Sequence, residues 1–266
     1  MRSRALAVRS CVVAAFATLV ASACSNLNTM RSVQTTGCVA NGHYYAPGGE
    51  FSMPIPRWST TVQDIVTEDP TTRRSAVQIA FFEDHGRWNG IECIPISDPT
   101  AVEHAAPDET RAKLSAWFEG TLIPNQKAVF PRLSVVASEE LALRDGSPAL
   151  FALVDMPEGS HIVDEKKERA GGFWGMTGGI SKWERKRRDT MRAFLCSFHR
   201  GSMYLSSAAH DELERQAPEG ETPEGRVRRL SEPAYVQSLK DELLALQASL
   251  EMPSKPAPVA DATNAR

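Results

Sequence analysis

The stretch "MRAFLCSFHRGSMYLSSAA", residues 191–209, decides the fold. Apolar, aromatic and small residues fill two runs on either side of a short turn at His199, Arg200 and Gly201. Two such runs joined by a tight turn that contains glycine are typical of a β-hairpin. The stretch therefore predicts two neighbouring antiparallel strands.

Two further strand pairs are predicted upstream of this unit. The segments "RLSVVASEELAL" (132–143) and "PALFALVDM" (148–156) flank the turn "RDGS". The segments "AVQIAFFED" (76–84) and "IECIPI" (91–96) flank "HGRWNG" in the same way. Because hairpins join strands that run in opposite directions, these patterns predict a largely antiparallel sheet.

Helical spacing appears in two places. The first helix is expected to start at a capping Asp108 and to stop at Pro124; its apolar residues are Leu114, Trp117, Phe118 and Leu122. The second is expected to start at a capping Ser231, and its apolar stripe consists of Val236, Leu239, Leu243, Leu246 and Leu250. Helices interspersed with runs of strands predict the α+β class, an antiparallel β-sheet with helices packed against it.

This pattern resembles the PsbP-like superfamily, which is named for an extrinsic subunit of the photosystem II oxygen-evolving complex. The resemblance lies in "YYAPGGEFSMPIP" (44–56), "LALRDGSPALFALVDM" (141–156) and "RAFLCSFHRGSMYLSSA" (192–208), and it covers residues 43–251. It implies α/β/α layering. The family includes bacterial lipoproteins and binding or assembly proteins, and the resemblance supplies no catalytic residue.

The N-terminus is typical of a bacterial secretion signal. Arg2, Arg4 and Arg9 precede the apolar segment "SCVVAAFATLVASA" (10–23), which is shorter than a membrane-spanning helix. "ASAC" resembles the lipobox of bacterial lipoproteins, in which the thiol, here of Cys24, takes a diacylglycerol carrying acyl chains such as palmitate. A plain secretory peptide with a chance cysteine is the alternative. We expect a signal peptide over 1–23 and a lipidated tether over 24–42.

The rest of the chain fits an envelope location. Ser25 is not the aspartate that tends to retain lipoproteins at the inner membrane, which favours the outer membrane, facing the periplasm. In that oxidising compartment, Cys38, Cys93 and Cys196 allow one disulfide and one free thiol; alternatively, all three are buried as small apolar residues. The formal net charge of −3 argues against a general nucleic-acid binder. Residues 252–266, rich in Pro and Ala, are expected to form a disordered tail.

A long connection over 157–190 interrupts the strand pattern. Its centre places Phe173, Trp174 and Met176 among glycines. Its C-terminal flank carries Trp183 and the basic residues Arg185, Lys186, Arg187 and Arg188. Such a loop could dock a protein partner, since Trp and Arg are common interface anchors, or contact an anionic membrane surface. Alternatively, its aromatic residues fold back over the core of the domain.

No catalytic, metal or cofactor motif stands out. "GMTGG" places Thr177 where a nucleophile elbow has serine, but no strand precedes it. We therefore predict no catalytic residue, metal or cofactor, and a non-enzymatic binding or assembly factor held to the membrane through Cys24. An envelope protein is the expected partner. The alternatives are a structural lipoprotein and an envelope hydrolase in which a serine or carboxylate meets a distant histidine such as His199.

Overall fold

The strand pair predicted from residues 191–209 is confirmed. In a computed structural model of the chain, β12 (Thr190–His199) pairs antiparallel with β13 (Ser202–His210). The structure describes residues 32–68, 75–83, 87–96, 102, 105–159, 163–168, 182–187, 189–210 and 220–252. Arg200 and Gly201 form the turn with φ values of 46° and 71°. Two successive positive φ values match the twist of the flanking strands, as in a type I′ hairpin.

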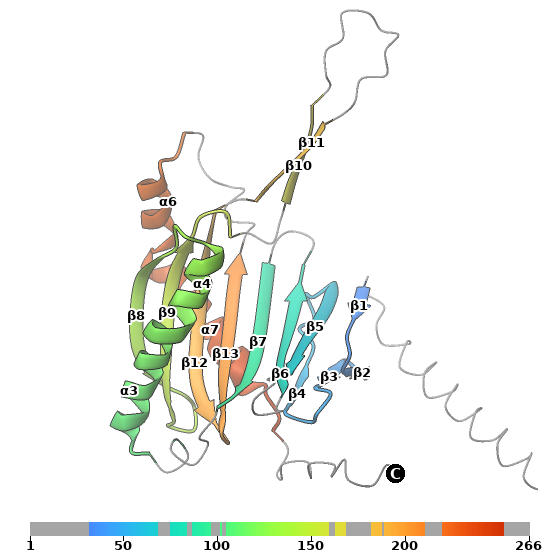
Figure 1. The fold of residues 1–266 in the computed structure, drawn as a ribbon, viewed down its shortest axis with the longest axis vertical. Helices are drawn as coiled ribbons and strands as arrows, with labels where there is room; N and C mark the ends of the chain where they lie inside the picture. The colour runs from blue at the N-terminus through green and yellow to red at the C-terminus, as the bar shows by residue number, and fades with distance from the viewer. Residues whose placement is uncertain are drawn as a thin grey trace, which may run out of the picture.

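One eight-stranded sheet organises the domain, in the order β1-β5-β6-β7-β13-β12-β9-β8 (Figure 1). The strands added to the central pair are β1 (Ser32–Gln34), β5 (Thr61–Glu68), β6 (Ser75–Phe82), β7 (Arg87–Pro95), β8 (Ser134–Ala142) and β9 (Pro148–Met156). All neighbours pair antiparallel except β1, which runs parallel to β5. The predicted α+β class is therefore confirmed.

Helices cover both faces of this sheet. In Figure 1, α3 (Pro107–Trp117) and α4 (Ile123–Val129) lie in front of β8, β9 and β12, whereas α7 (Pro233–Ala248) lies behind the sheet. Successive residues of a strand point to opposite faces. The buried side chains accordingly form two clusters, one around Leu239, Leu243 and Leu246 of α7 and one around Leu114 and Phe118.

The helix boundaries differ from the predicted ones. Asp108 lies in the first turn of α3 rather than at its N-cap, which is Ala106. Pro124 does not end the helix: a π-helix, η1 (Phe118–Leu122), leads into α4, with Pro124 in the first turn of α4. The π-helical turn directly before Pro124 interrupts the regular hydrogen bonding to the fourth preceding residue, at the place where the proline ring would otherwise clash with the preceding turn.

A helix that the sequence pattern missed precedes α7. Helix α6 (Pro223–Leu230) starts at Thr222, whose hydroxyl accepts a hydrogen bond from Gly225 N–H. Ser231, predicted to cap the last helix, instead ends α6, and Glu232 is the N-cap of α7. In the described part of the chain, no helix has the length and apolar character needed to cross a membrane.

The N-terminal part of the domain begins earlier than predicted. The strands β2 (Cys38–Ala40), β3 (His43–Tyr45) and β4 (Ser52–Pro54) form a small antiparallel sheet, and β1 lies at the edge of the large one. The carboxylate of Asp64 accepts hydrogen bonds from Thr36, from Gly37 and from the hydroxyl of Tyr44. The tether expected over 24–42 is therefore wrong from residue 32 onwards.

The remaining segment predictions lie mostly outside the described residues. This applies to the signal peptide over 1–23 and to the tail, except Met252, which packs against the core. The connection 157–190 contains the antiparallel strands β10 (Val163–Glu168) and β11 (Lys182–Arg187).

Of the two alternatives for the cysteines, the disulfide is not formed, since Cys38, Cys93 and Cys196 are all free, and burial holds for Cys93 and Cys196. Cys93 belongs to the cluster under α7, whereas Cys196 belongs to the cluster under α3. Their side chains thus lie on opposite faces of the sheet and cannot be bridged. Cys38 is exposed on the small N-terminal sheet.

Candidate functional site

The candidate site residues, Cys24 and those of the long connection, are only partly placed by the structure. Cys24, Phe173, Trp174, Met176 and Arg188 lie outside the described residues. The others, namely Trp183, Arg185, Lys186 and Arg187, lie on β11.

The register of the β10–β11 pair sets acidic and basic residues opposite one another. Four of the six residue pairs join opposite charges: Asp164–Lys186, Glu165–Arg185, Lys166–Glu184 and Glu168–Lys182. Opposite charges placed directly across a strand pair stabilise it by roughly 0.2–1 kcal/mol each. The register therefore places an acid opposite Lys182, Arg185 and Lys186 of β11, a correspondence that the linear sequence does not show.

A pocket of about 870 Å³ lies at the end of the sheet where two hairpin turns meet the last turns of α7. Because β9 and β12 pair antiparallel, the start of β9 lies beside the end of β12, so the β8–β9 and β12–β13 turns are neighbours. The walls are largely apolar and include Leu143, Phe198, Leu244, Ala248, Leu250 and Met252.

Two polar side chains of this lining are buried: Ser197 of β12 and Gln247 of α7, which is 8% exposed. Its amide nitrogen donates a hydrogen bond to the hydroxyl of Ser197 on β12. Its carbonyl oxygen, Oε1, has no hydrogen-bond partner among the described residues. A buried acceptor without a donor typically costs about 1–3 kcal/mol, and because Oε1 is closed to water it is closed to a ligand in the pocket as well.

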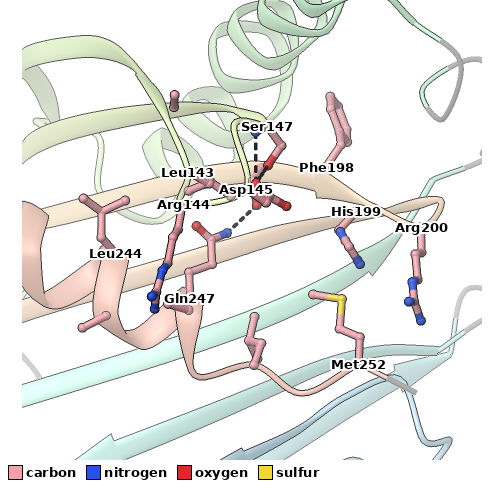
Figure 2. A pocket seen from close by; sticks show the side chains of 15 residues that line it. Leu143, Arg144, Asp145, Ser147, Phe198, His199, Arg200, Leu244, Gln247 and Met252 are labelled. Atoms are coloured by element: carbon pink, nitrogen blue, oxygen red, sulfur yellow. Dashed lines mark hydrogen bonds between the residues drawn. The ribbon is translucent and has the colours of Figure 1, made fainter. Parts of the chain in front are cut away.

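Charged and polar groups occupy the turn end of the pocket. Arg144, Asp145 and Ser147 come from the β8–β9 turn, and His199 and Arg200 from the β12–β13 turn. In the view of Figure 2, Gln247 lies between Arg144 and Leu244 on one side and His199, Arg200 and Met252 on the other. Arg144 is exposed and makes no ion pair within the described ranges.

Asp145 and Ser147 hold the β8–β9 turn together. Ser147 donates to Asp145 Oδ1 from its hydroxyl, at 2.6 Å, and from its backbone N–H, at 3.0 Å. These hydrogen bonds, with a smaller effect from the charge of His199, lower the pKa of Asp145. Gly146, between them, has a φ of 83°, which glycine adopts without strain.

Ser147, His199 and Asp145 are not arranged as a catalytic triad. In a triad, histidine stands between the serine and the carboxylate and takes the proton of the serine hydroxyl. Here the serine hydroxyl donates directly to the carboxylate. In the described residues, no group of three or more His, Cys, Asp and Glu side chains is placed to hold a metal ion.

A second polar cluster lies where α7 crosses β7 and β13. Glu242 of α7 accepts hydrogen bonds from Arg87, at 2.9 and 2.6 Å, and from Asn89, at 2.8 Å. His210 Nε2 lies 2.6 Å from the other carboxylate oxygen of Glu242. Every bond joins α7 to the sheet, so we assign this cluster to fixing the helix in place.

Comparisons with known proteins give a likeness in structure only. No family model matches the chain, and no curated protein matches its sequence. The structure is similar to the solution structure of cyanobacterial PsbP (CyanoP) from Synechocystis sp. PCC 6803, over 82% of this chain and 98% of that chain. The sequence identity is 9% and the TM-score is 0.36.

Sequence reasoning named His199 but missed the pocket around it. The turns "RDGS" and "HRG" were both identified, yet their proximity follows only from the pairing of β9 with β12. Gln247 is one polar residue on an otherwise amphipathic helix, and no periodicity distinguishes it from a solvated position. The available signal was an uncharged amide between Leu246 and Leu250, near the apolar stripe of α7.

Proposed function

We propose that this chain is a lipid-anchored lipoprotein of the bacterial outer membrane that acts in the periplasm as a non-enzymatic binding or assembly factor. The basic start, the short apolar segment and Cys24 support the anchor. The pocket at the end of the sheet supports a binding role. Pockets of a few hundred to a thousand Å³ with apolar walls and a few polar groups are typical of ligand sites.

The hydrogen bonding and exposure of the polar groups in this pocket favour binding over catalysis. Arg144, at the turn end of the pocket, is exposed and makes no ion pair within the described residues, so its charge is open to a ligand. Ser147, the hydroxyl nearest to a carboxylate, already donates to Asp145. The pocket is thus suited to hold a ligand, and its serine is not activated as a nucleophile.

The connection 157–190 is proposed as a second contact, with an envelope protein. The acids of β10 that stand opposite the basic residues of β11 favour a protein partner over an anionic membrane surface, because they offset the positive charge that would attract lipid head groups. Phe173, Trp174, Met176 and Trp183 supply the aromatic and apolar residues that such interfaces use.

Two experiments test the proposal. Mass spectrometry of the mature N-terminus should find Cys24 acylated, and Cys24→Ser should release the chain from the membrane fraction. An unmodified Cys24 would refute the anchor. Crosslinking in cells should capture an envelope protein with the wild-type chain but not with a variant in which residues 169–181 are replaced by a two-residue turn. Equal capture by both chains would refute the role of the loop.

An envelope hydrolase is the second candidate, because Ser147, Asp145 and His199 line one pocket. It predicts hydrolysis of a generic ester or peptide substrate that is lost in both Ser147→Ala and His199→Ala. Activity with this behaviour would replace the binding proposal, whereas activity that survives both changes would arise elsewhere.

A further inference from the structure

We propose that Arg226 of α6 is a positioning residue that fixes the root of the connection 157–190, so that the β10–β11 hairpin is presented to its partner in one orientation. The root consists of residues 155–159 and 189–190, where the connection leaves β9 and enters β12. The inference rests on the proposed role of this connection as a contact with an envelope protein, and it names the residue that sets the geometry of that contact. In Figure 1 the hairpin extends beyond the end of the sheet at which β9 ends and β12 begins, and α6 lies near that end.

The two sides of the root are tied to each other. Glu158 N–H donates a hydrogen bond to Asp189 Oδ1, at 2.9 Å, which joins the chain just after β9 to the residue just before β12. Glu158 has a φ of 61°. A glutamate adopts this left-handed conformation only where its surroundings hold it there, and such strained residues cluster at functional sites. The exit of the chain from β9 is therefore a fixed feature of the domain.

The root also packs closely against the last strand pair. Met156 and Thr190 form the final pair between β9 and β12. A Cβ atom added to Gly159 would lie 2.6 Å from Cβ of Met156 and 3.3 Å from Cγ2 of Thr190, so a larger residue does not fit there unless these neighbours move. Arg192 of β12 donates a hydrogen bond to the backbone carbonyl of Gly159, at 3.1 Å. The chain is thus held against the end of the sheet before it continues towards β10.

Arg226 joins this root to a separate helix. Its Nη2 donates a hydrogen bond to Asp155 Oδ1, at 2.6 Å, and lies 3.9 Å from Asp189 Oδ2. Arg226 and Asp155 are 7% and 8% exposed, and charges that are buried together are screened much less than charges at the surface. Asp155 lies on the β9 side of the root and Asp189 on the β12 side. One guanidinium of α6 therefore interacts with both sides of the root.

Little chain separates the root from the hairpin. The first pair of the hairpin, Val163 and Arg187, lies four residues after Gly159 and two residues before Asp189. Because an extended chain covers at most about 3.5 Å per residue, the shorter link spans at most about 7 Å. A fixed root therefore limits the directions that the hairpin can take. Binding to a hairpin that is already oriented costs less entropy than binding to one that samples many directions.

The test measures the distance between the hairpin and the sheet by double electron–electron resonance. The full chain is used in lipid nanodiscs, with Cys38→Ser to remove the exposed thiol and with nitroxide labels at Lys166→Cys on β10 and Ser138→Cys on β8. We expect one narrow distance distribution for this chain and a distribution at least twice as broad when Arg226→Gln is added. An unchanged width in Arg226→Gln would overturn the proposal.

The matched control is Arg229→Gln on the same helix. It removes another arginine–carboxylate contact, that of Arg229 with Glu221 at the start of α6, and should leave the distance distribution unchanged. Equal broadening by Arg229→Gln and Arg226→Gln would show that any loss of charge on α6 loosens the hairpin, and would overturn the assignment to Arg226.

A second variant keeps the test decisive if Arg226→Gln fails to fold. The side chain of Asp189 is 41% exposed, so Asp189→Ala removes the contacts with Glu158 and Arg226 while the buried pair of Arg226 with Asp155 remains. It should broaden the distance distribution as well. If Arg226 acts on stability alone, the variants speed amide exchange in β12 and β13 while the distribution stays narrow, and that result would overturn the proposal.

Crosslinking in cells measures the consequence for the partner. Arg226→Gln should capture the envelope protein several-fold less than the wild-type chain, and Arg229→Gln should capture it equally well. Equal capture by Arg226→Gln would overturn the role of Arg226 in presenting the hairpin. If the wild-type chain itself captures no partner, the proposed function fails, whereas the distance distributions still decide whether Arg226 fixes the root. The two failures are therefore distinguishable.

Discussion

Glu242 is the residue at which the polar contacts between α7 and the sheet converge. Its side chain is 11% exposed and accepts hydrogen bonds from Arg87 and Asn89, with His210 beside its second oxygen. Burial raises the pKa of Glu242, but the hydrogen bonds and the charge of His210, together with Arg87 and Asn89, outweigh burial and lower that pKa from 4.5 to about 2. The carboxylate is therefore bound more tightly in the folded chain than in the unfolded one.

We predict that Glu242→Gln lowers the free energy of unfolding at pH 7 by about 3 kcal/mol, the cost of breaking a buried charge pair. Because the folded pKa of Glu242 is depressed, its contribution is complete above pH 4.5 and is lost as the pH falls from 4.5 to about 2. Urea unfolding of both chains between pH 7 and pH 2.5 should show the gap closing. As a control, Asp241→Asn at the exposed neighbouring position should change the free energy of unfolding by less than about 0.5 kcal/mol. A stability difference between the wild-type chain and Glu242→Gln that does not depend on pH would contradict the prediction.

At the scale of elements, the register of the β10–β11 hairpin sets acids opposite bases. Its six residue pairs include few apolar residues, and most of them join an acid to a base. A two-stranded hairpin is only marginally stable in water, so pairs worth a few tenths of a kcal/mol each decide how often it forms.

We predict that Glu165→Arg, which sets like charges opposite one another at Arg185, lowers the protection of the hairpin amides several-fold in hydrogen exchange. Adding Arg185→Glu restores the opposite pair and should restore protection. The amides of β12 and β13 serve as the internal control, because their exchange should be equal in all three chains. A double variant that remains as unprotected as the single one would show that the register does not act through charge.

At the scale of the whole molecule, the sheet separates two cores that share no side chains. Cys93 lies in the core under α7 and Cys196 in the core under α3, while Cys38 is exposed. Burial raises the pKa of the Cys196 thiol, which disfavours its reactive thiolate form. Oxidation cannot join the two buried thiols without unfolding the domain.

We predict that iodoacetamide labels Cys38 in the folded chain within minutes and labels Cys93 and Cys196 only in denaturant. Mass spectrometry of tryptic peptides reads each position separately, and the same labelling is expected in samples purified without reductant. A disulfide-linked pair of peptides among these three would contradict the opposed placement of the buried cysteines.

The sequence was informative where local patterns decide structure. The runs that became β9, β12 and β13 alternate or are continuously apolar and are bounded by turns, and the stripe on α7 recurs at helical spacing. Helix ends were harder to predict. Asp108 and Ser231 are good capping residues, but neither is the N-cap of a helix here. A π-helical turn continues the helix past Pro124.

The candidate site could not be predicted because it depends on distant contacts. Arg144 and Gln247 line one pocket only because β9 pairs with β12 and α7 packs across them. The same holds for Asp64, which binds residues 27 and 28 positions earlier in the chain. Neither arrangement leaves a periodic signal.

With the proposed acyl group on Cys24, the early start of the folded domain, at β1, limits how far the domain lies from the membrane surface. Ser32 follows Cys24 by only eight residues. Because a fully extended chain covers at most about 3.5 Å per residue, this connecting segment spans at most about 28 Å. The proposed anchor would therefore keep the start of the domain within that distance of the membrane surface. Whatever the domain captures must come close to that surface or be embedded beside it.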